Sequence, residues 1–400
     1  MTRRLFGTGL FLTHFAALYH FLFSDSEGVL IDTLLYKTQV CWPFVPFCRE
    51  MRPAFTVLAP ALCATLGLLA MAGVASLWWP RWRPFTPAIA IAALAVKYAI
   101  ILQDYTLMGN FHYITLALWA AYLLDRESLW SPRFALVSCY VAAGLVKLHP
   151  EWLSGSVLRS FIGSFKPEWL VHTALLEALA PAALLNVILE LFVALFLLSS
   201  KRVFFAAALV LLTAFHLLSW PVVGVTFPVT MLLLLAPLWF LVFSPSAWAQ
   251  EASLQRQVFR RPRAWLVPAL VLLLQLPARV GARDPALTGE GRLWSINMLD
   301  SHPFCRAFYL FETEPGVWID ISSLRSDLGP RLQCDPVVIS EIMTSSCLNL
   351  QSDAPSLHGH AALFSKRGPK GDAQKIFAIP DSCEKRIRFH PFLKNDWMEP

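Results

Sequence analysis

Ionisable side chains within long apolar stretches are the residues of this 400-residue sequence best suited to do chemistry. They are His14, His20, Lys97, Asp104, His112, Lys147, Glu190, His216 and Arg279. A charged group inside a membrane is costly, so such residues mark functional sites by default. A lysine among apolar residues is favoured in its neutral form and can act as a base, and a histidine can donate or accept hydrogen bonds.

Three of these residues reach a similar depth if the apolar stretches are membrane helices. His112 lies about one turn from the outer end of the fourth stretch, at ~1.5 Å per residue. Lys147 ends the fifth stretch, and His216 lies close to the outer end of the seventh. We therefore predict that His112, Lys147 and His216 share a catalytic site near the outer face.

Structural roles explain the other ionisable residues more simply. Lys97 and Glu190 lie in the middle of the third and sixth stretches, and we expect them to pair with one another, because pairing offsets the cost of desolvation. His14 and His20 are six residues apart and do not share a helical face cleanly. Arg279, at the end of the last stretch, is expected to extend its charge to the interface.

The composition indicates a membrane protein with a soluble end. The chain is 56% hydrophobic and 15% charged, with a mean hydropathy of +0.54. Residues 1–281 hold 20 Lys/Arg and 12 Asp/Glu, so about 11% are charged; residues 282–400 hold 13 and 15, about 24%, as in soluble domains. A soluble enzyme, a disordered chain and a nucleic-acid binder fit this poorly. We predict a helical membrane domain over 1–281 and a soluble domain over 282–400.

Nine apolar stretches are candidates for membrane helices, since a bilayer core of ~30 Å needs ~20 apolar residues. They lie near 5–23, 54–79, 87–105, 107–124, 134–148, 181–200, 203–219, 221–243 and 264–280. The first follows Arg3 and Arg4 without a cleavage-like site, and we interpret it as a retained helix. The sequence predicts an all-α polytopic bundle of about nine transmembrane helices.

The distribution of positive charge predicts the orientation. With the N-terminus in the cytoplasm, the cytoplasmic loops carry twelve Lys/Arg and the external loops five. The domain over 282–400 then lies in the periplasm or the ER lumen. Six of the eight cysteines fall on that oxidising side, where disulfides persist; they are Cys41, Cys48, Cys305, Cys334, Cys347 and Cys383. We expect at least one bridge within the tail, a possible bridge from the first loop to the tail, and buried free thiols elsewhere.

The tail is expected to be a small, mostly β-containing domain. Short β-prone runs at 317–321 and 375–379 lie between Gly, Pro and Asp turns. The segment 151–180 is too polar to span a membrane but rich in Trp, Phe and Leu, and we expect it to lie at the interface over the external site. The cysteine spacing does not resemble a zinc ribbon, and no metal site is predicted.

One segment carries a family resemblance. The run Ala143-Gly144-Leu145-Val146-Lys147-Leu148-His149-Pro150-Glu151-Trp152-Leu153-Ser154-Gly155 resembles the Ala-Gly-x-x-Lys-Leu-x-x-x-Trp-x-x-Gly segment of vitamin K-dependent γ-glutamyl carboxylases and their bacterial relatives with the HTTM membrane domain. Weaker likenesses occur in the same order at Asn110-Phe111-His112-Tyr113, Phe215-His216, the loop of Cys41 and Arg52-Pro53, and Leu293-Trp294-Ser295-Ile296-Asn297-Met298.

The resemblance implies a quinol-driven carboxylase. Lys147 would be the base that deprotonates vitamin K hydroquinone or a related reduced quinone, with O2 and CO2 as co-substrates. His112 would hydrogen-bond the quinone oxygen or the developing carboxylate, and His216 would be a second polar contact. The implied partners are membrane lipid, the quinone and an extracytoplasmic peptide or protein carrying the glutamate. The residues that bind the cofactor are not assigned.

Two other classes of function remain open. In a non-catalytic membrane scaffold or partner-binding protein of the same fold, Lys147 would extend its charge to the interface and the two histidines would bond between helices. A transporter is less favoured, because neither an inverted repeat nor a pair of broken helices is evident, although Pro221 and Pro228 interrupt one stretch.

Overall fold

The computed structural model describes most of the chain, and it divides into two compact units. The described residues are 1–23, 40–45, 48–159, 179–258, 261–276, 283–290, 295–296, 303–321, 330–350, 358–367, 372–384, 389–390 and 394–399. The first unit comprises residues 1–24, 54–101 and 108–274, and the second comprises 25–53, 102–107 and 275–400. The second unit therefore joins two segments from the first third of the chain to the C-terminal part.

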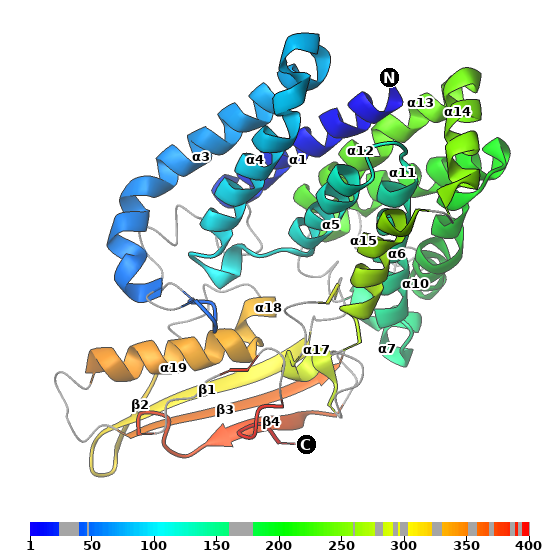
Figure 1. Ribbon diagram of the computed structural model, residues 1–400. Helices are drawn as coiled ribbons and strands as arrows, with labels where there is room; N and C mark the ends of the chain where they lie inside the picture. Colours follow the sequence, from blue (N-terminus) through cyan, green and yellow to red (C-terminus); the bar gives the residue numbers. More distant parts are fainter. Residues whose placement is uncertain are drawn as a thin grey trace. The chain divides into compact units, whose positions relative to one another are not determined.

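The first unit is a bundle of helices (Figure 1). Its elements are α1 (Thr2–Phe23), α3 (Cys48–Trp78), η1 (Pro80–Phe85), α4 (Thr86–Ile101), α5 (Asn110–Leu124), α6 (Trp130–Val146), α7 (Pro150–Leu153), α10 (Leu179–Ile188), η4 (Leu189–Val193), η5 (Ala194–Leu198), α11 (Arg202–Val223), α12 (Thr226–Leu235), η6 (Ala236–Leu238), α13 (Trp239–Phe243), α14 (Pro245–Arg256) and α15 (Pro262–Leu273). Each apolar stretch of the sequence forms a helix, because helices satisfy their own backbone hydrogen bonds in lipid.

Among the described residues, six helices are long and apolar enough to cross a membrane, so nine spans are not confirmed. They cover Thr2–Phe23, Pro53–Trp78, Pro80–Ile101, Leu179–Leu198, Arg202–Trp220 and Thr226–Phe243. The other three expected spans, α5, α6 and α15, are helices of 15, 17 and 12 residues. At 1.5 Å per residue they reach only about 18–26 Å, less than the ~30 Å of a bilayer core.

The short helix α6 forms the interior of the bundle. It packs against α5, α15, η4 and η5, and 14 of its 17 residues are buried. The long helices are more exposed, with 28% of the most apolar window of Pro53–Trp78 buried. Polar side chains of α6, such as Arg133 and Tyr140, are therefore buried inside the bundle.

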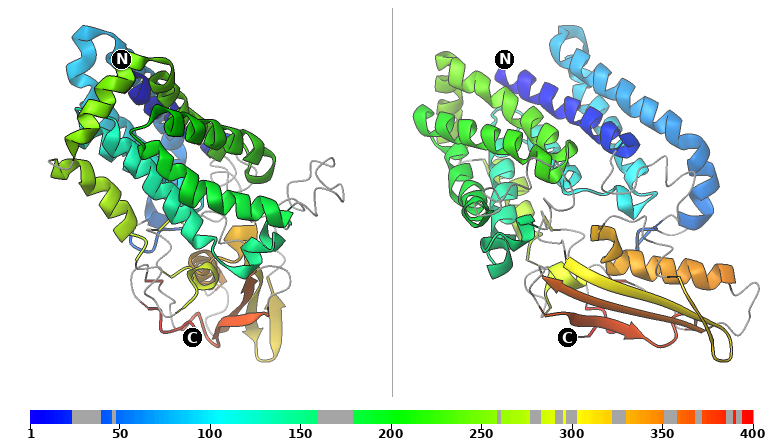
Figure 2. Two further views of the ribbon diagram at one scale, coloured as in Figure 1. Left: turned by 90° about the vertical axis from the view of Figure 1, so that its right-hand side faces the viewer. Right: turned by 180° about the vertical axis from the view of Figure 1, so that it is seen from behind.

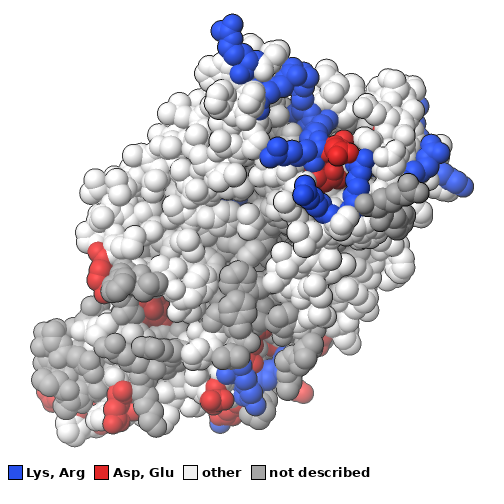
Figure 3. Space-filling model, viewed as in Figure 1, with Lys and Arg blue, Asp and Glu red and all other residues white. Residues whose placement is uncertain are grey.

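The positively charged loops of the bundle meet at one end, where Lys and Arg gather in Figure 3. The contacts there join Arg3 to the Asp125 carbonyl (2.6 Å), Arg133 to the Leu197 carbonyl (2.8 Å), Arg202 to the Val242 carbonyl (2.9 Å), and Arg261 to the Glu127 carboxylate (2.8 Å). The N-terminus and the loops that follow α5, η5 and α13 therefore lie on the same side of the bundle.

The second unit contains a four-stranded antiparallel sheet of order β2-β1-β3-β4. Its strands are β1 (Pro303–Glu314), β2 (Val317–Asp320), β3 (His358–Arg367) and β4 (Gln374–Ile379), and its helices are η2 (Tyr105–Leu107), α17 (Pro285–Thr288), α18 (Pro330–Gln333) and α19 (Pro336–Leu350). The strands expected at 317–321 and 375–379 are confirmed as β2 and β4. The helix α19 lies along one face of the sheet (Figure 2), and residues of β3 alternate between buried and exposed.

Three disulfides hold the second unit together. Two join the tail, Cys305 to Cys334 and Cys347 to Cys383, which confirms the expected bridging there. The third joins Cys41 to Cys48 within the first loop, so a bridge from that loop to the tail is wrong. A hydrogen bond of 2.7 Å from Tyr105 Oη to Asp335 Oδ2 links the same region to the tail instead. The remaining cysteines, Cys63 and Cys139, are buried free thiols, as predicted.

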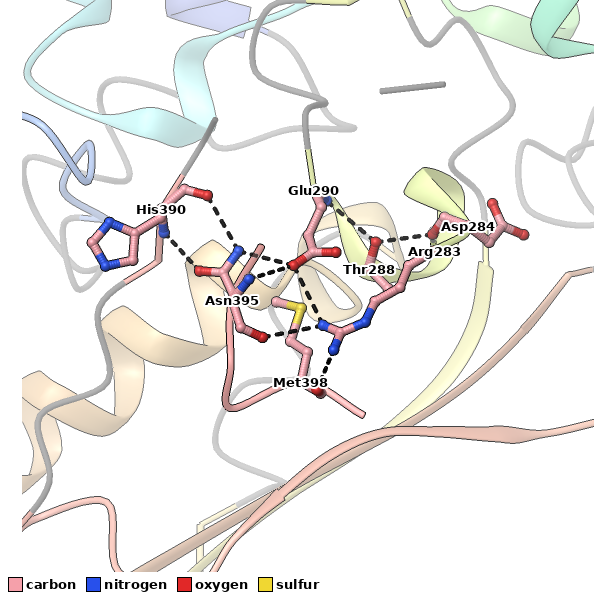
Figure 4. A network of polar contacts seen from close by, with 7 residues as sticks. All are labelled: Arg283, Asp284, Thr288, Glu290, His390, Asn395 and Met398. Carbon is pink, nitrogen blue, oxygen red and sulfur yellow. Dashed lines mark hydrogen bonds and ion pairs between the residues drawn. The ribbon is translucent and has the colours of Figure 1, made fainter. Parts of the chain in front are cut away.

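A polar network attaches the C-terminal residues to the segment around α17 (Figure 4). The Arg283 guanidinium contacts the Glu290 carboxylate (3.4 Å) and donates to the carbonyl of Met398 (2.7 Å). The backbone N–H of Asn395 donates to Glu290 Oε1 at 2.7 Å. All these contacts lie within the second unit, so they stabilise the tail rather than form a site with the helical bundle.

Candidate functional site

A buried ion pair lies at the centre of the helical bundle. Lys147 is the residue that ends α6, and its Nζ lies 2.6 Å and 2.5 Å from the two carboxylate oxygens of Glu190. Each side chain is 1% exposed. Because both groups are buried, each is the charge partner that offsets the desolvation of the other.

An irregular turn positions the acidic partner. Glu190 lies in η4, a π-helical turn between α10 and η5, and such turns occur frequently at functional sites. Opposite it stands Gly144 of α6, where a Cβ atom would lie 2.7 Å from Leu191 Cγ and 3.2 Å from Glu190 Cβ. The absence of a side chain at Gly144 therefore allows α6 to approach the turn closely enough for the ion pair to form.

The motif that follows Lys147 adds an aromatic wall. The Lys147 Nζ lies 5.3 Å from the centre of the Trp152 ring, within the range of a cation–π contact. Trp152 is buried, and its indole N–H donates to the carbonyl of Ala183 at 3.3 Å. His149 begins α7 and accepts a hydrogen bond from the Trp152 backbone N–H at 3.3 Å, with Pro150 next in the helix. The five residues from Lys147 to Trp152 thus lead the chain from the end of α6 into α7, which places the indole ring beside the lysine amine.

His216 reaches the same neighbourhood through a tyrosine. The hydroxyl of Tyr140 and Nε2 of His216 lie 2.6 Å apart, and both side chains are buried. Tyr140 precedes Lys147 by seven residues, or about two helical turns, so the two share one face of α6. The charge of Lys147 also acts on the His216 ring. The structure therefore brings two of the three predicted residues, Lys147 and His216, to one cluster.

The third predicted residue, His112, lies in a cluster of rings. It is buried in the first turn of α5, with ring centres 5.4 Å from Phe21 and 5.6 Å from His20. Since α5 and α6 form a short antiparallel hairpin, the beginning of α5 and the end of α6 lie at the same end of it. His112 thus lies at the same end of the hairpin as Lys147, as its depth in the apolar stretch predicted. Among the described residues, its ring packs against aromatic side chains of α1 rather than against the ion pair.

The expected pair of Lys97 with Glu190 is wrong. Glu190 is held by Lys147, and Lys97 donates a hydrogen bond of 2.7 Å to Thr115 Oγ1. The depth of a lysine along its helix does not show whether it pairs with Glu190, because the pairing depends on which helices are neighbours. The contact between α6 and η4 makes Lys147 the partner of Glu190.

Two residues of the cluster were not predicted as site residues. Tyr140 is not among the ionisable residues of the apolar stretches, although its position seven residues before Lys147 indicates that the two share one face of a helix. Glu190 was predicted to pair with Lys97 and pairs with Lys147 instead. Arg279, most of the segment 151–180 and four of the residues 293–298 lie outside the described residues. Asp104 has a local role, since its carboxylate accepts from the N–H and the hydroxyl of Thr106 at 2.8 and 2.7 Å.

Two buried polar atoms on side chains linked to the ion pair have no hydrogen-bond partner in the described part of the chain. They are Nδ1 of His216, whose ring contacts Tyr140, and Oδ1 of Asn186, which precedes Glu190 by four residues. Polar atoms buried in this way normally bind a ligand or an ordered water. No group of three or more His, Cys, Asp or Glu that could hold a metal ion occurs among the described residues.

Comparisons of the chain with family models, with curated proteins and with solved structures each gave no match. The geometry of the site is therefore the basis of the proposed function.

Proposed function

We propose that this chain is an integral membrane enzyme of the vitamin K-dependent carboxylase type, which couples the oxidation of a reduced quinone to γ-carboxylation of glutamate in a peptide or protein. The observation that supports it is the buried Lys147–Glu190 pair, which lies in the segment that resembles that family. Deprotonation of the quinol, the first step, requires a neutral amine that acts as the base and a neighbouring carboxylate that can take up the proton of that amine.

The pair would act by internal proton transfer. When Glu190 takes a proton from Lys147, the amine becomes neutral and can accept the proton of a quinol hydroxyl. The Trp152 ring limits where the amine can move, since it lies against the same atom that contacts the carboxylate.

The surroundings fit a quinone. Asn186 Oδ1 and His216 Nδ1 are buried without partners in the described part of the chain, and a quinol head has two oxygens that could satisfy such atoms. Apolar side chains such as Leu184 and Leu185 of α10 are half exposed, as required of a surface that meets a prenyl tail or lipid. When bound, the reduced quinone and O2 would supply the driving force for removing the glutamate γ-proton, and CO2 would capture the carbanion.

We further propose that the N-terminus is cytoplasmic and that the tail is periplasmic or ER-lumenal. The positively charged end of the bundle supports this orientation, because Lys and Arg are retained on the cytoplasmic side. The three disulfides of the second unit support it independently, since they persist in an oxidising compartment.

The test is epoxide formation by purified protein in nanodiscs with vitamin K hydroquinone, O2, bicarbonate and a glutamate-containing peptide. The wild type is compared with Lys147→Ala and with Lys201→Ala, an exposed lysine at the start of α11. We expect the exposed variant to match the wild type and Lys147→Ala to lose activity by roughly 10²–10⁴-fold, the usual worth of a general base. Equal epoxide formation by all three proteins would refute the role of Lys147.

A non-catalytic scaffold is the second candidate, and one observation favours it. The edge strand β2 exposes Val317, Trp318 and Ile319 by 44–48%, a surface able to contact a partner, and disulfides stabilise the unit that carries it. In that case the folded wild type would form no epoxide, and Lys147→Ala would bind the partner as well as the wild type does.

A further inference from the structure

A second buried lysine lies in the bundle, and among the described residues no acidic side chain pairs with it. Lys97 of α4 is 0% exposed, and among the described residues its only hydrogen bond is to Thr115 Oγ1, 2.7 Å away, with the Tyr98 ring 5.6 Å from its Nζ. A lysine amine carries up to three N–H donors, so its remaining donors have no acceptor there. A buried donor left in this way costs free energy unless something else accepts from it.

The Thr115 hydroxyl accepts from only one of the Lys97 donors. It donates its own proton to the carbonyl of His112 at 3.0 Å, which leaves only its lone pairs for Lys97. The same carbonyl also accepts from the Tyr98 hydroxyl at 2.8 Å. Lys97 is therefore the donor to Thr115, and the His112 carbonyl already accepts from two hydroxyl groups.

A buried histidine lies against the same part of α5 as Lys97. His14 of α1 is 0% exposed, and neither of its ring nitrogens has a hydrogen-bond partner in the described part of the chain. Its ring neighbour Trp119 is one helical turn from Thr115, the residue that accepts from Lys97. Trp119 stacks on the His14 ring, with centres 6.1 Å apart, and closes one side of it. The imidazole adds at least one more N–H donor in search of an acceptor.

We propose that Lys97, Thr115 and His14 form a second buried site, on α4, α5 and α1, that binds a small oxyanion, either bicarbonate or a carboxylate. Such an ion supplies several acceptor oxygens, which the remaining donors of Lys97 and His14 lack, while Thr115 holds the Lys97 amine in place. Its negative charge would also favour the protonated form of that amine. The site does not depend on the proposed carboxylase activity, because it rests on different residues.

The test is direct binding of ¹³C-formate and, separately, ¹³C-bicarbonate to the purified full chain in nanodiscs, measured by line broadening of the anion signal at constant ionic strength. The wild type is compared with Lys97→Met and with Lys201→Met, which removes an exposed lysine. We expect saturable binding to the wild type and to Lys201→Met, and at least a tenfold higher Kd for Lys97→Met. Stronger binding of one anion than the other would identify which oxyanion the site prefers.

A second pair of variants guards against misfolding of Lys97→Met. Thr115→Val keeps the shape of its side chain and His14→Phe keeps a ring, and each should raise the Kd at least threefold while circular dichroism is unchanged. Absence of saturable binding to the wild type overturns the proposal. So does equal binding by the wild type and all three variants of the site, which would locate the anion elsewhere. Epoxide formation is not read in this assay, so its outcome is separate from that of the proposed function.

Discussion

The ion pair between Lys147 and Glu190 makes a strong prediction about stability. Each side chain is 1% exposed and the nitrogen lies 2.5 Å from the nearer oxygen. Removing one partner of such a pair leaves an uncompensated buried charge, which costs about 3–5 kcal/mol. We therefore expect Lys147→Met and Glu190→Leu each to lower the free energy of unfolding by that amount, which at about 4 kcal/mol reduces the folded-to-unfolded ratio by roughly three orders of magnitude.

The double variant should be far less damaged than either single variant. With both charges gone, apolar side chains of similar volume fill the space, a change that is often neutral or stabilising for buried pairs. The coupling energy of the cycle should then exceed about 3 kcal/mol. The measurement is the free energy of unfolding from SDS titration in mixed micelles, with the disulfides intact, for the wild type, both single variants and the double variant.

A matched pair on the same unit provides the control. Arg261 and Glu127 form an ion pair of 2.8 Å, but the Glu127 side chain is 68% exposed. Exposed pairs contribute about 0–1 kcal/mol, so the same cycle at these residues should give little coupling. If the effects of Lys147→Met and Glu190→Leu simply add, within about 0.5 kcal/mol, the two residues do not act as a buried pair and the reasoning is refuted.

Two further predictions concern a glycine and a histidine. Gly144→Ala should lower the free energy of unfolding by roughly 1–3 kcal/mol, because the new Cβ would lie 2.7 Å from Leu191 Cγ, and it should also reduce epoxide formation; an unchanged melting temperature would contradict the close approach. In the second unit, the hydrogen bond to Asp381 (2.5 Å), aided by its charge, raises the pKa of His358 above its ordinary 6.5. The interaction of charged His358 with Asp381 therefore stabilises the folded state fully below pH 6.5, and this stabilisation is lost as the pH rises through the folded-state pKa of His358. NMR titration should show that this pKa falls in Asp381→Asn but not in a variant distant from it.

The sequence was most informative where composition and local chemistry decide the outcome. The apolar stretches form helices, because a helix satisfies its backbone without neighbours. The short β-prone runs form β2 and β4, and cysteines of the charged tail form two disulfides. The segment from Lys147 to Trp152 also selected the residue that the structure places in the buried ion pair.

The sequence was least informative where neighbours decide. Apolar length alone gave nine spans, but α5, α6 and α15 are shorter than a bilayer core, and α6 is buried by the helices around it. The helix α19 was not anticipated, because its burial depends on the sheet beneath it.

Local properties of the chain therefore indicated a membrane protein and its helices, and they singled out Lys147, which the structure places in a buried ion pair. Tertiary structure alone decided that Glu190 pairs with Lys147 and leaves Lys97 to Thr115, that Tyr140 links His216 to the face of Lys147, and that Cys41 bonds to Cys48. The physical reason is that a hydrogen bond or an ion pair acts over about 3 Å. Which groups come that close is set by the packing of helices distant in sequence, and no local pattern encodes it.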